Sequence, residues 1–177
     1  MKNGTKIKVA VVILATVLIG GSACRRPQPA ATNPPAANAF GWELDRGQRG
    51  RISDYKGKVL LLDFYATWCD PCRAETPHLV ELHQRYASQG LQLIGLNVGG
   101  EDDHAEVPAF AKEFGIQYPL AIPDDEFVDQ YLGLNQNIPQ SFIIDRQGRV
   151  VKRFVGFGEA SAQELDRVVE STLAQSQ

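Results

Sequence analysis

Two long apolar runs dominate the hydrophobic pattern of the chain. Residues Val59–Tyr65 and 91–98 are almost uninterrupted by polar side chains, which is typical of strands buried on both faces. Between these runs, residues 69–88 repeat apolar side chains at helical spacing, with Pro77 expected to kink the helix. A strand, a helix and a strand with short connections form a right-handed unit, so the sequence predicts that the two strands are parallel.

Shorter periodic segments surround this unit. In chain order they predict a hairpin over 41–52, a helix over 107–114, a short strand over 118–122, a helix over 124–132, antiparallel strands over 141–145 and 150–155, and a last helix from Ser161. Asp103 is expected to cap the helix over 107–114, with Glu106 completing a capping box. Ser161 and Glu164 form the same pattern at the last helix. The order predicts an α/β protein of three layers, in which a mixed central sheet carries helices on both faces.

The N-terminal residues follow the order of a secretory signal. Residues 2–8 contain three lysines, residues 9–19 are small or apolar, and small residues lead to Cys24. The apolar run is too short for a comfortable membrane-spanning helix, which needs about 20 residues. The segment before Cys24 resembles a bacterial lipoprotein box, although Gly21 stands where that box usually has leucine. Lipidation of Cys24, cleavage by an ordinary signal peptidase and retention as an uncleaved anchor are the three alternatives.

The residues after Cys24 indicate a tether. Residues 25–39 are rich in proline and alanine and have no apolar periodicity, which favours a semi-extended linker. We therefore expect a signal or membrane anchor at 1–24, a linker at 25–39 and a folded domain at 40–177. This organisation predicts a domain held at a membrane on its extracytoplasmic side, in the periplasm or cell envelope. In such an oxidising compartment, two cysteines that lie close together in the sequence are expected to take part in redox chemistry.

The overall composition limits the possible functions. Apolar residues make up 44% of the 177 residues, which is enough for a sizeable core. The formal net charge is −3 and the folded region has no basic cluster, so neither nucleic acid nor an anionic lipid surface is an expected ligand. The three cysteines are too few for a disulfide scaffold or a four-cysteine zinc site, and no metal is expected.

The chemistry of the chain is concentrated in the segment Trp68-Cys69-Asp70-Pro71-Cys72. It falls where a predicted buried strand ends and a helix begins. A thiolate at a helix N-terminus faces unpaired N–H groups and the positive end of the helix dipole, which lower the pKa of the thiol. We expect Cys69 to stay reachable and Cys72 to turn inward. Half of a zinc site and an inert structural disulfide are the alternatives, but zinc needs further ligands and inert disulfides rarely occupy such junctions.

Residues from about 40 to 175 resemble the thioredoxin superfamily, and more narrowly the anchored extracytoplasmic branch that includes the TlpA, ResA and CcmG proteins. The matching pieces are Gly57-Lys58, the decapeptide from Asp63 to Cys72, Glu75, Pro77, Ile138-Pro139 and Asp145-Arg146-Gln147-Gly148. The decapeptide is highly specific, and the other pieces fall at the expected distances from it. The resemblance implies a thioredoxin-like sandwich with an N-terminal hairpin and a helical segment inserted at 99–133.

Asp63 is a polar residue in the middle of an otherwise apolar strand. A carboxyl group in that position is expected to be desolvated, which raises its pKa. The resemblance implies that Asp63 transfers a proton beside Cys72. The alternative is an aspartate that merely reaches solvent at the end of the strand, and the mid-strand position argues against it.

The resemblance also implies which residues meet the substrate. These residues are Trp68, Pro71, Ile138 and Pro139. The bond before Pro139 is implied to be cis, with the backbone of Ile138 open to pair with an extended substrate. The ResA-like branch often has a glutamate directly after Asn97-Val98-Gly99, where this chain has Gly100. Glu101 either serves in its place after a shift of one residue or belongs to a solvated acidic loop.

These features predict a thiol–disulfide oxidoreductase that works without a bound cofactor. Cys69 is expected to attack a substrate disulfide and Cys72 to resolve the mixed disulfide that forms. Asp70 beside Cys69 disfavours the thiolate, which points to a reductase. The resemblance implies protein disulfide substrates, with apocytochrome c as the family-level expectation, and a membrane thiol carrier as the electron donor. We expect a monomer.

Two other functions are compatible with the same fold. A copper chaperone of the Sco type would have two cysteines three residues apart and a distant histidine, whereas the spacing here is two residues. A peroxide-reducing relative would need a proline and a threonine ahead of a single peroxidatic cysteine. Thr67 lies two residues before Cys69, but the rest of that motif is absent.

Overall fold

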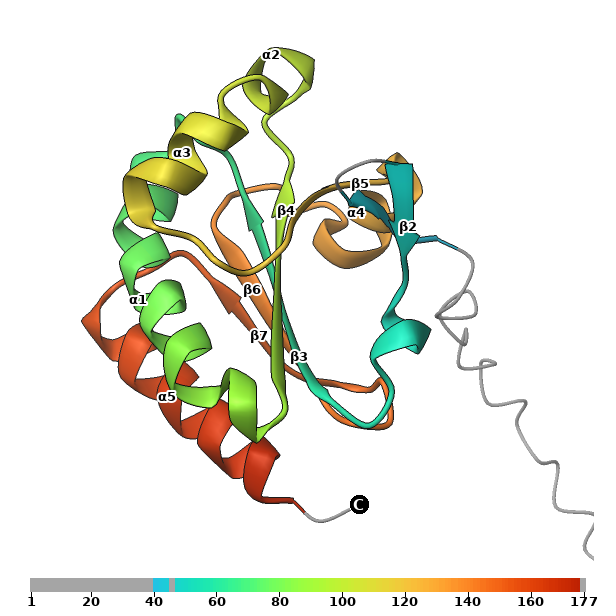
Figure 1. Ribbon diagram of the computed structural model, residues 1–177, viewed down its shortest axis with the longest axis vertical. Coiled ribbons are helices and arrows are strands. Elements are labelled where there is room, and N and C mark those ends of the chain that lie inside the picture. The colour runs from blue at the N-terminus through green and yellow to red at the C-terminus, as the bar shows by residue number, and fades with distance from the viewer. Residues whose placement is uncertain (1–39, 45–46, 176–177) are drawn as a thin grey trace, which may run out of the picture. The chain divides into compact units, whose positions relative to one another are not determined.

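The computed structural model describes residues 40–44 and 47–175, which form a mixed seven-stranded sheet with the strand order β2-β1-β5-β4-β3-β6-β7 (Figure 1). The strands are β1 (Trp42–Leu44), β2 (Gln48–Gly50), β3 (Val59–Tyr65), β4 (Leu91–Asn97), β5 (Leu120–Pro123), β6 (Gln140–Ile144) and β7 (Val150–Val155). β3, β4 and β5 are parallel, whereas the other neighbouring strands pair antiparallel. The predicted parallel pair and the mixed sheet are therefore confirmed.

Helices cover both faces of this sheet, as predicted. One face carries α1 (Asp70–Tyr86), α3 (Val107–Phe114) and α5 (Glu159–Ala174), and the other carries α4 (Asp125–Leu132) and the 3-10 helix η2 (Ile52–Tyr55) (Figure 1). A short helix, α2 (Glu101–His104), follows the carboxyl end of β4, and the 3-10 turn η3 (Ala87–Gln89) extends α1. The fold is the predicted α/β sandwich, with the N-terminal hairpin formed by β1 and β2.

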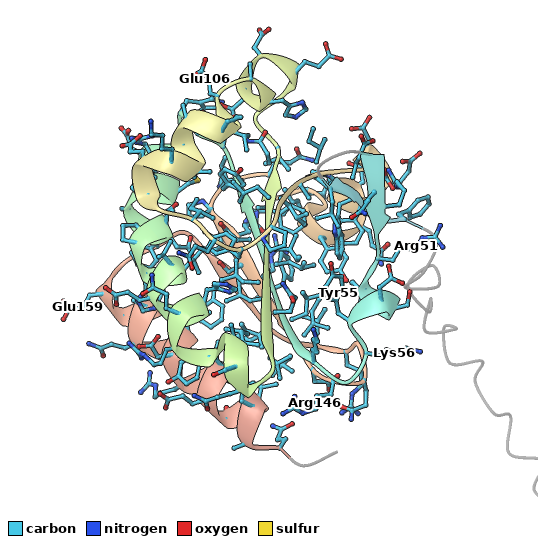
Figure 2. The ribbon with its side chains drawn as sticks, in the orientation of Figure 1. Arg51, Tyr55, Lys56, Glu106, Arg146 and Glu159 are labelled. Atoms are coloured by element: carbon cyan, nitrogen blue, oxygen red, sulfur yellow. A yellow bond between two sulfur atoms is a disulfide. The ribbon has the colours of Figure 1, made fainter. Side chains whose placement is uncertain are left out.

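The central strand β3 supplies side chains to both hydrophobic layers. All of its residues are buried, and alternate side chains point to opposite faces. Leu62 and Phe64 pack toward α4 in one cluster, which also holds Trp42, while Leu61 packs toward α1 and α5 in the other. Tyr55, labelled in Figure 2, stacks on Trp42 with ring centroids 5.9 Å apart. Burial of one such large apolar side chain contributes roughly 1.5–3 kcal/mol to the free energy of folding. Strand β3 therefore stabilises the part of the fold that precedes the cysteines.

Two predicted helix caps are wrong. Asp103 lies within α2 and does not cap α3; the N-cap of α3 is Glu106, which makes no side-chain cap bond. α5 begins two residues before Ser161, whose hydroxyl accepts a hydrogen bond from the Gly158 N–H at 2.8 Å. Glu164 makes an ion pair with Lys152 at 2.8 Å in place of the expected capping contact.

Part of the predicted domain organisation lies outside the described residues. This applies to the signal or anchor at 1–24 with Cys24, to the linker at 25–39 and to residues 45–46 in the turn of the first hairpin. Within 40–44 and 47–175, no helix combines the length and apolar character needed to cross a membrane.

Candidate active site

Cys69 and Cys72 form a disulfide where β3 leads into α1, with their Cα atoms 5.2 Å apart. Cys69 is the N-cap residue of α1, and its Sγ accepts a hydrogen bond from the Cys72 N–H at 3.2 Å. A thiolate in that position would face the same N–H and the positive end of the helix dipole, both of which stabilise the anion. The geometry therefore favours Cys69 as the nucleophile when the pair is reduced.

Cys69 is less accessible than the sequence predicts, whereas Cys72 is turned inward as expected. Cys69 is 5% exposed and Cys72 is 2% exposed. They belong to a small cluster with Tyr65, Ala66 and Phe110, and Ile138 packs against it. Cys69 is the outer residue of the two, but the expectation of a freely reachable Cys69 is wrong for the disulfide form because the residue is packed into this cluster.

Two buried carboxyl groups occupy the same side of the sheet as the disulfide. Asp63 is 4% exposed and Glu75 is 3% exposed. Asp63 lies opposite Ser141 in the antiparallel register of β3 and β6, and the Ser141 hydroxyl donates a hydrogen bond to Glu75 Oε1 at 2.7 Å. Asp63 Oδ1 is buried without a hydrogen-bond partner among the described residues. Ser141 thus joins the strand next to Asp63 to the helix that carries Glu75.

Burial raises the pKa of both carboxyl groups. For Asp63, desolvation is the main cause, and the charge of Glu75 raises the pKa further, to well above its usual value. Desolvation raises the pKa of Glu75 to about 7, partly offset by the hydrogen bond from Ser141. No lysine or arginine makes an ion pair with either group in the described part of the chain. The predicted desolvation of Asp63 and the rise of its pKa are confirmed.

Glu75 is the main residue that the sequence reasoning did not assign to the site. The sequence supports it only as a position that matches the family, whereas in the structure it is a buried carboxyl group whose charge raises the pKa of Asp63. A signal for it exists in the helix pattern: Cys72, Glu75, Thr76 and Leu79 are all buried on one face of α1. An acidic residue at a position that points inward, three residues after Cys72, indicates either a buried partner or a shifted pKa.

A groove of about 510 Å³ is lined by Trp68, which directly precedes Cys69, and by Ile138, which packs against the cluster that holds both cysteines. Its apolar lining includes Trp68, Val98, Val128, Leu132 and Ile138. Glu101 and Asp125 line it as well, while neither lysine nor arginine does. Trp68 is 64% exposed, which is unusual for a large aromatic side chain and leaves its surface available for contact. The groove therefore suits an extended chain that carries apolar side chains and no negative charge.

The loop before β6 forms one wall of this groove. The Ile138-Pro139 bond is cis, as the resemblance implies. The Pro139 carbonyl accepts a hydrogen bond from the Gly156 N–H at 2.8 Å, whereas the N–H and carbonyl of Ile138 make no hydrogen bond within residues 40–44 and 47–175. Pro71 is exposed in the first turn of α1. The substrate contacts expected of these residues remain predictions.

Glu101 lies at the exposed start of α2 and lines the groove next to Trp68. Glu101 is exposed, whereas Asp63 and Glu75 are buried, so it does not belong to the same group of carboxyl groups. Among the described residues, no group of three or more histidine, cysteine, aspartate or glutamate side chains is arranged to hold a metal ion.

Comparison with known proteins adds independent information. Residues 35–153 match the AhpC/TSA family. The chain is similar to the thiol-disulfide oxidoreductase ResA of Geobacillus thermodenitrificans, with 36% identity over 110 residues that span 62% of each chain, a little under two thirds of that relative. ResA of Geobacillus kaustophilus is 33% identical over 126 residues, which cover 71% of this chain and 70% of that protein. The thiol:disulfide interchange protein of the thioredoxin family from Chlorobium tepidum TLS has a similar structure, with a TM-score of 0.67, 31% identity, and coverage of 82% of this chain and 100% of that one.

Proposed function

The chain belongs to the AhpC/TSA family, in the ResA-like group of thioredoxin-fold proteins, and we propose that it is a thiol–disulfide oxidoreductase that acts through Cys69 and Cys72. The observation that carries this proposal is a disulfide at the N-terminus of α1 with two buried carboxyl groups, Asp63 and Glu75, on the same side of the sheet. A disulfide that served only to stabilise the fold would gain nothing from two desolvated acids nearby. The same pairing of two cysteines favours exchange over the single-cysteine chemistry of a peroxide reductase.

The proposed reaction begins with the reduced protein. The Cys69 thiolate attacks one sulfur of a substrate disulfide, forms a mixed disulfide and releases the other substrate sulfur as a thiolate. Cys72 loses its proton and attacks the Cys69 sulfur, which breaks the mixed disulfide and releases the second substrate thiolate. The protein is left with the Cys69–Cys72 disulfide, and the two substrate sulfurs take up two protons. Two electrons therefore pass from the dithiol to the substrate.

We propose that Asp63 and Glu75 together accept the proton of Cys72. Glu75, with a pKa of about 7, is partly ionised at neutral pH, while burial and the Glu75 charge both raise the pKa of Asp63 and oppose its ionisation. A base with a pKa near the working pH transfers protons most effectively. This arrangement extends the role that the sequence assigns to Asp63 alone: Asp63 holds the proton of the pair, and Glu75 supplies the basic oxygen.

The substrate is proposed to be an extended segment of a protein that carries a disulfide. Support comes from the backbone groups of Ile138, which are free to pair with such a segment, and from the apolar side chains of Trp68 and Val98 in the groove. The acidic residues Glu101 and Asp125 would disfavour a substrate segment with negative charge.

The signal-like order of residues 1–24 and the proline-rich residues 25–39 support a proposal for the cellular setting. We propose that the domain works as a reductase on the extracytoplasmic side of a membrane, held there either by the N-terminal segment or by a lipid on Cys24. A membrane thiol carrier would return electrons to the disulfide. Apocytochrome c is the proposed substrate, because its cysteines must be reduced before haem is attached.

The test of this proposal is a disulfide exchange assay on the full chain. The protein should catalyse reduction of insulin disulfides by dithiothreitol, and the Cys69→Ser variant should show no catalysis. Its reduction potential, measured in glutathione buffers, should fall nearer the thioredoxin value of about −270 mV than the DsbA value of about −120 mV. An oxidising potential would contradict the reductase direction, and an inactive wild-type protein would contradict the activity itself.

A further inference from the structure

Asp103 is a buried carboxylate that belongs to the inserted segment and contacts the loop before the cysteines. It is 4% exposed, and its Oδ2 accepts hydrogen bonds from the Thr67 N–H at 3.0 Å and from Asn97 Nδ2 at 2.7 Å. Its Oδ1 accepts a further hydrogen bond from the Thr67 hydroxyl. Burial alone would raise the pKa of Asp103, but these hydrogen bonds outweigh it and hold the pKa below the usual value. Asp103 is therefore a negative charge at neutral pH.

The surrounding backbone leaves space for this carboxylate. A side chain at Gly99 would place its Cβ 2.1 Å from Asp103 Oδ2, so the position admits only glycine while Asp103 is bound to Thr67. The Gly99 N–H also donates to Asn97 Oδ1 at 3.1 Å, which orients the Asn97 amide toward Asp103. No lysine or arginine pairs with Asp103 in the described part of the chain. Its hydrogen bonds are thus directed at Thr67 and are not part of a surface ion pair.

Thr67 is held from its other side as well. Its carbonyl accepts a hydrogen bond from Arg73 Nη1 at 3.2 Å. Arg73 makes an ion pair with Glu113 of α3, and its guanidinium lies 5.1 Å from the ring centroid of Phe114. Both peptide groups of Thr67 are therefore fixed, one by Asp103 of α2 and the other through Arg73 by α3. Thr67 is itself only 8% exposed and directly precedes the exposed Trp68.

We infer that Asp103 adjusts the redox centre by its charge: its hydrogen bonds to Thr67 hold a permanent negative charge against the loop that carries Trp68 and Cys69, two residues before the attacking cysteine. This inference rests on the proposed function. A nearby anion in a poorly solvated region disfavours a second negative charge, so it raises the pKa of the Cys69 thiol. The reduced form then gains less stabilisation from its thiolate, and the Cys69–Cys72 pair becomes a stronger reductant. The inserted segment thereby adjusts the chemistry of the cysteines as well as the shape of the groove.

Other titratable groups lie on the elements around Asp103 and Cys69, and every variant in the test must leave them unchanged. They are Asp63 and Glu75 on the buried side, Asp70 and Arg73 on α1, and Glu101 and His104 at α2. The variant Asp103→Asn removes the charge of Asp103 and keeps its shape, and it replaces one accepting oxygen by an amide group that can donate to the Thr67 hydroxyl. The matched control is Thr67→Val, which removes one hydrogen bond to Asp103 and leaves the charge in place.

The experiment measures the rate of Cys69 alkylation against pH, in a Cys72→Ser background, and the equilibrium of each two-cysteine protein with glutathione. We expect Asp103→Asn to lower the pKa of the Cys69 thiol by about half a unit and to weaken the reducing strength of the pair roughly threefold. Thr67→Val should lower the melting temperature but leave the alkylation profile unchanged. If Asp103→Asn does not fold, Asp103→Ser, which leaves room for water beside Thr67, carries the same expectation.

Two results would overturn the inference. One is that the rate of Cys69 alkylation depends on pH in the same way in Asp103→Asn as in the protein with Asp103. The other is an equal shift in Thr67→Val, which would mean that loosening of the loop, not the charge, controls the thiol. The alkylation measurement needs no substrate protein. A chain that reduced no protein disulfide would therefore contradict the proposed function and still report whether Asp103 acts on Cys69.

Discussion

Replacing Glu75 by glutamine should remove much of the pH dependence of the protein's stability. The pKa of Glu75 is raised from 4.5 to about 7 in the folded protein. Between these values the folded state keeps the proton and the unfolded state has lost it. The stabilisation is therefore fully present below pH 4.5 and is lost as the pH rises to about 7. A shift of about 2.5 pKa units corresponds to roughly 3 kcal/mol of unfolding free energy.

The assay is urea unfolding of the disulfide form at several pH values from 4.5 to 8, because the oxidised cysteines do not titrate. The wild-type protein should lose stability across this range, and Glu75→Gln should lose clearly less. Glutamine keeps the shape of the side chain, and its amide oxygen can still accept the hydrogen bond from Ser141. Asp63→Asn is the matched variant, since the pKa of Asp63 is also raised and contributes a loss of the same sign.

The double variant Asp63→Asn with Glu75→Gln should show the flattest profile of the four proteins. If wild type and Glu75→Gln have parallel profiles between pH 4.5 and 7, the reasoning is refuted, because Glu75 would then have the same pKa in the folded and unfolded states. A wild-type stability that gains on that of Glu75→Gln as the pH rises in this range would contradict it more strongly, since it would require a lowered pKa for Glu75.

Two further predictions concern the groove and the sheet. Trp68→Ala should lower kcat/KM for a polypeptide disulfide about tenfold, equivalent to ~1.4 kcal/mol, and should leave kcat/KM for a small aromatic disulfide nearly unchanged. Equal losses for both substrates would show that Trp68 acts on the cysteines and not on the substrate chain. Gly95→Ala should destabilise the fold by about 1–3 kcal/mol in urea unfolding, because its Cβ would lie 2.6 Å from Leu120 Cδ2 and 3.2 Å from Tyr65 Cε1; an unchanged midpoint would mean that these side chains move aside freely.

The sequence predicts the scaffold well where one physical signal dominates. The apolar run at Val59–Tyr65 coincides with β3 to the residue, because a strand buried on both faces tolerates few polar side chains. The helix over 124–132 and the hairpin formed by β6 and β7 were predicted on equally clear patterns and are confirmed. The disulfide between Cys69 and Cys72 and its place at the start of α1 follow from the strand-to-helix junction.

The sequence is less informative where a polar side chain has several available partners. Asp103 fits a helix cap by spacing alone, but Thr67, which is 36 residues away in the chain, provides two donors that bind it more favourably. Glu75 carries no local signal for its contact with Ser141, since 66 residues separate the two. Such contacts depend on how β3, β6 and α1 are packed together, which no local pattern contains.

The central claim is that Cys69 attacks the substrate and Cys72 resolves the mixed disulfide. The most direct measurement is mass spectrometry of the reduced Cys72→Ser and Cys69→Ser variants after each is mixed with a peptide that contains one disulfide. We predict that Cys72→Ser accumulates a covalent adduct linked through Cys69, because the resolving thiol is missing, and that Cys69→Ser accumulates none. An adduct at Cys72 of the Cys69→Ser variant, formed as fast as the adduct at Cys69, would contradict the account.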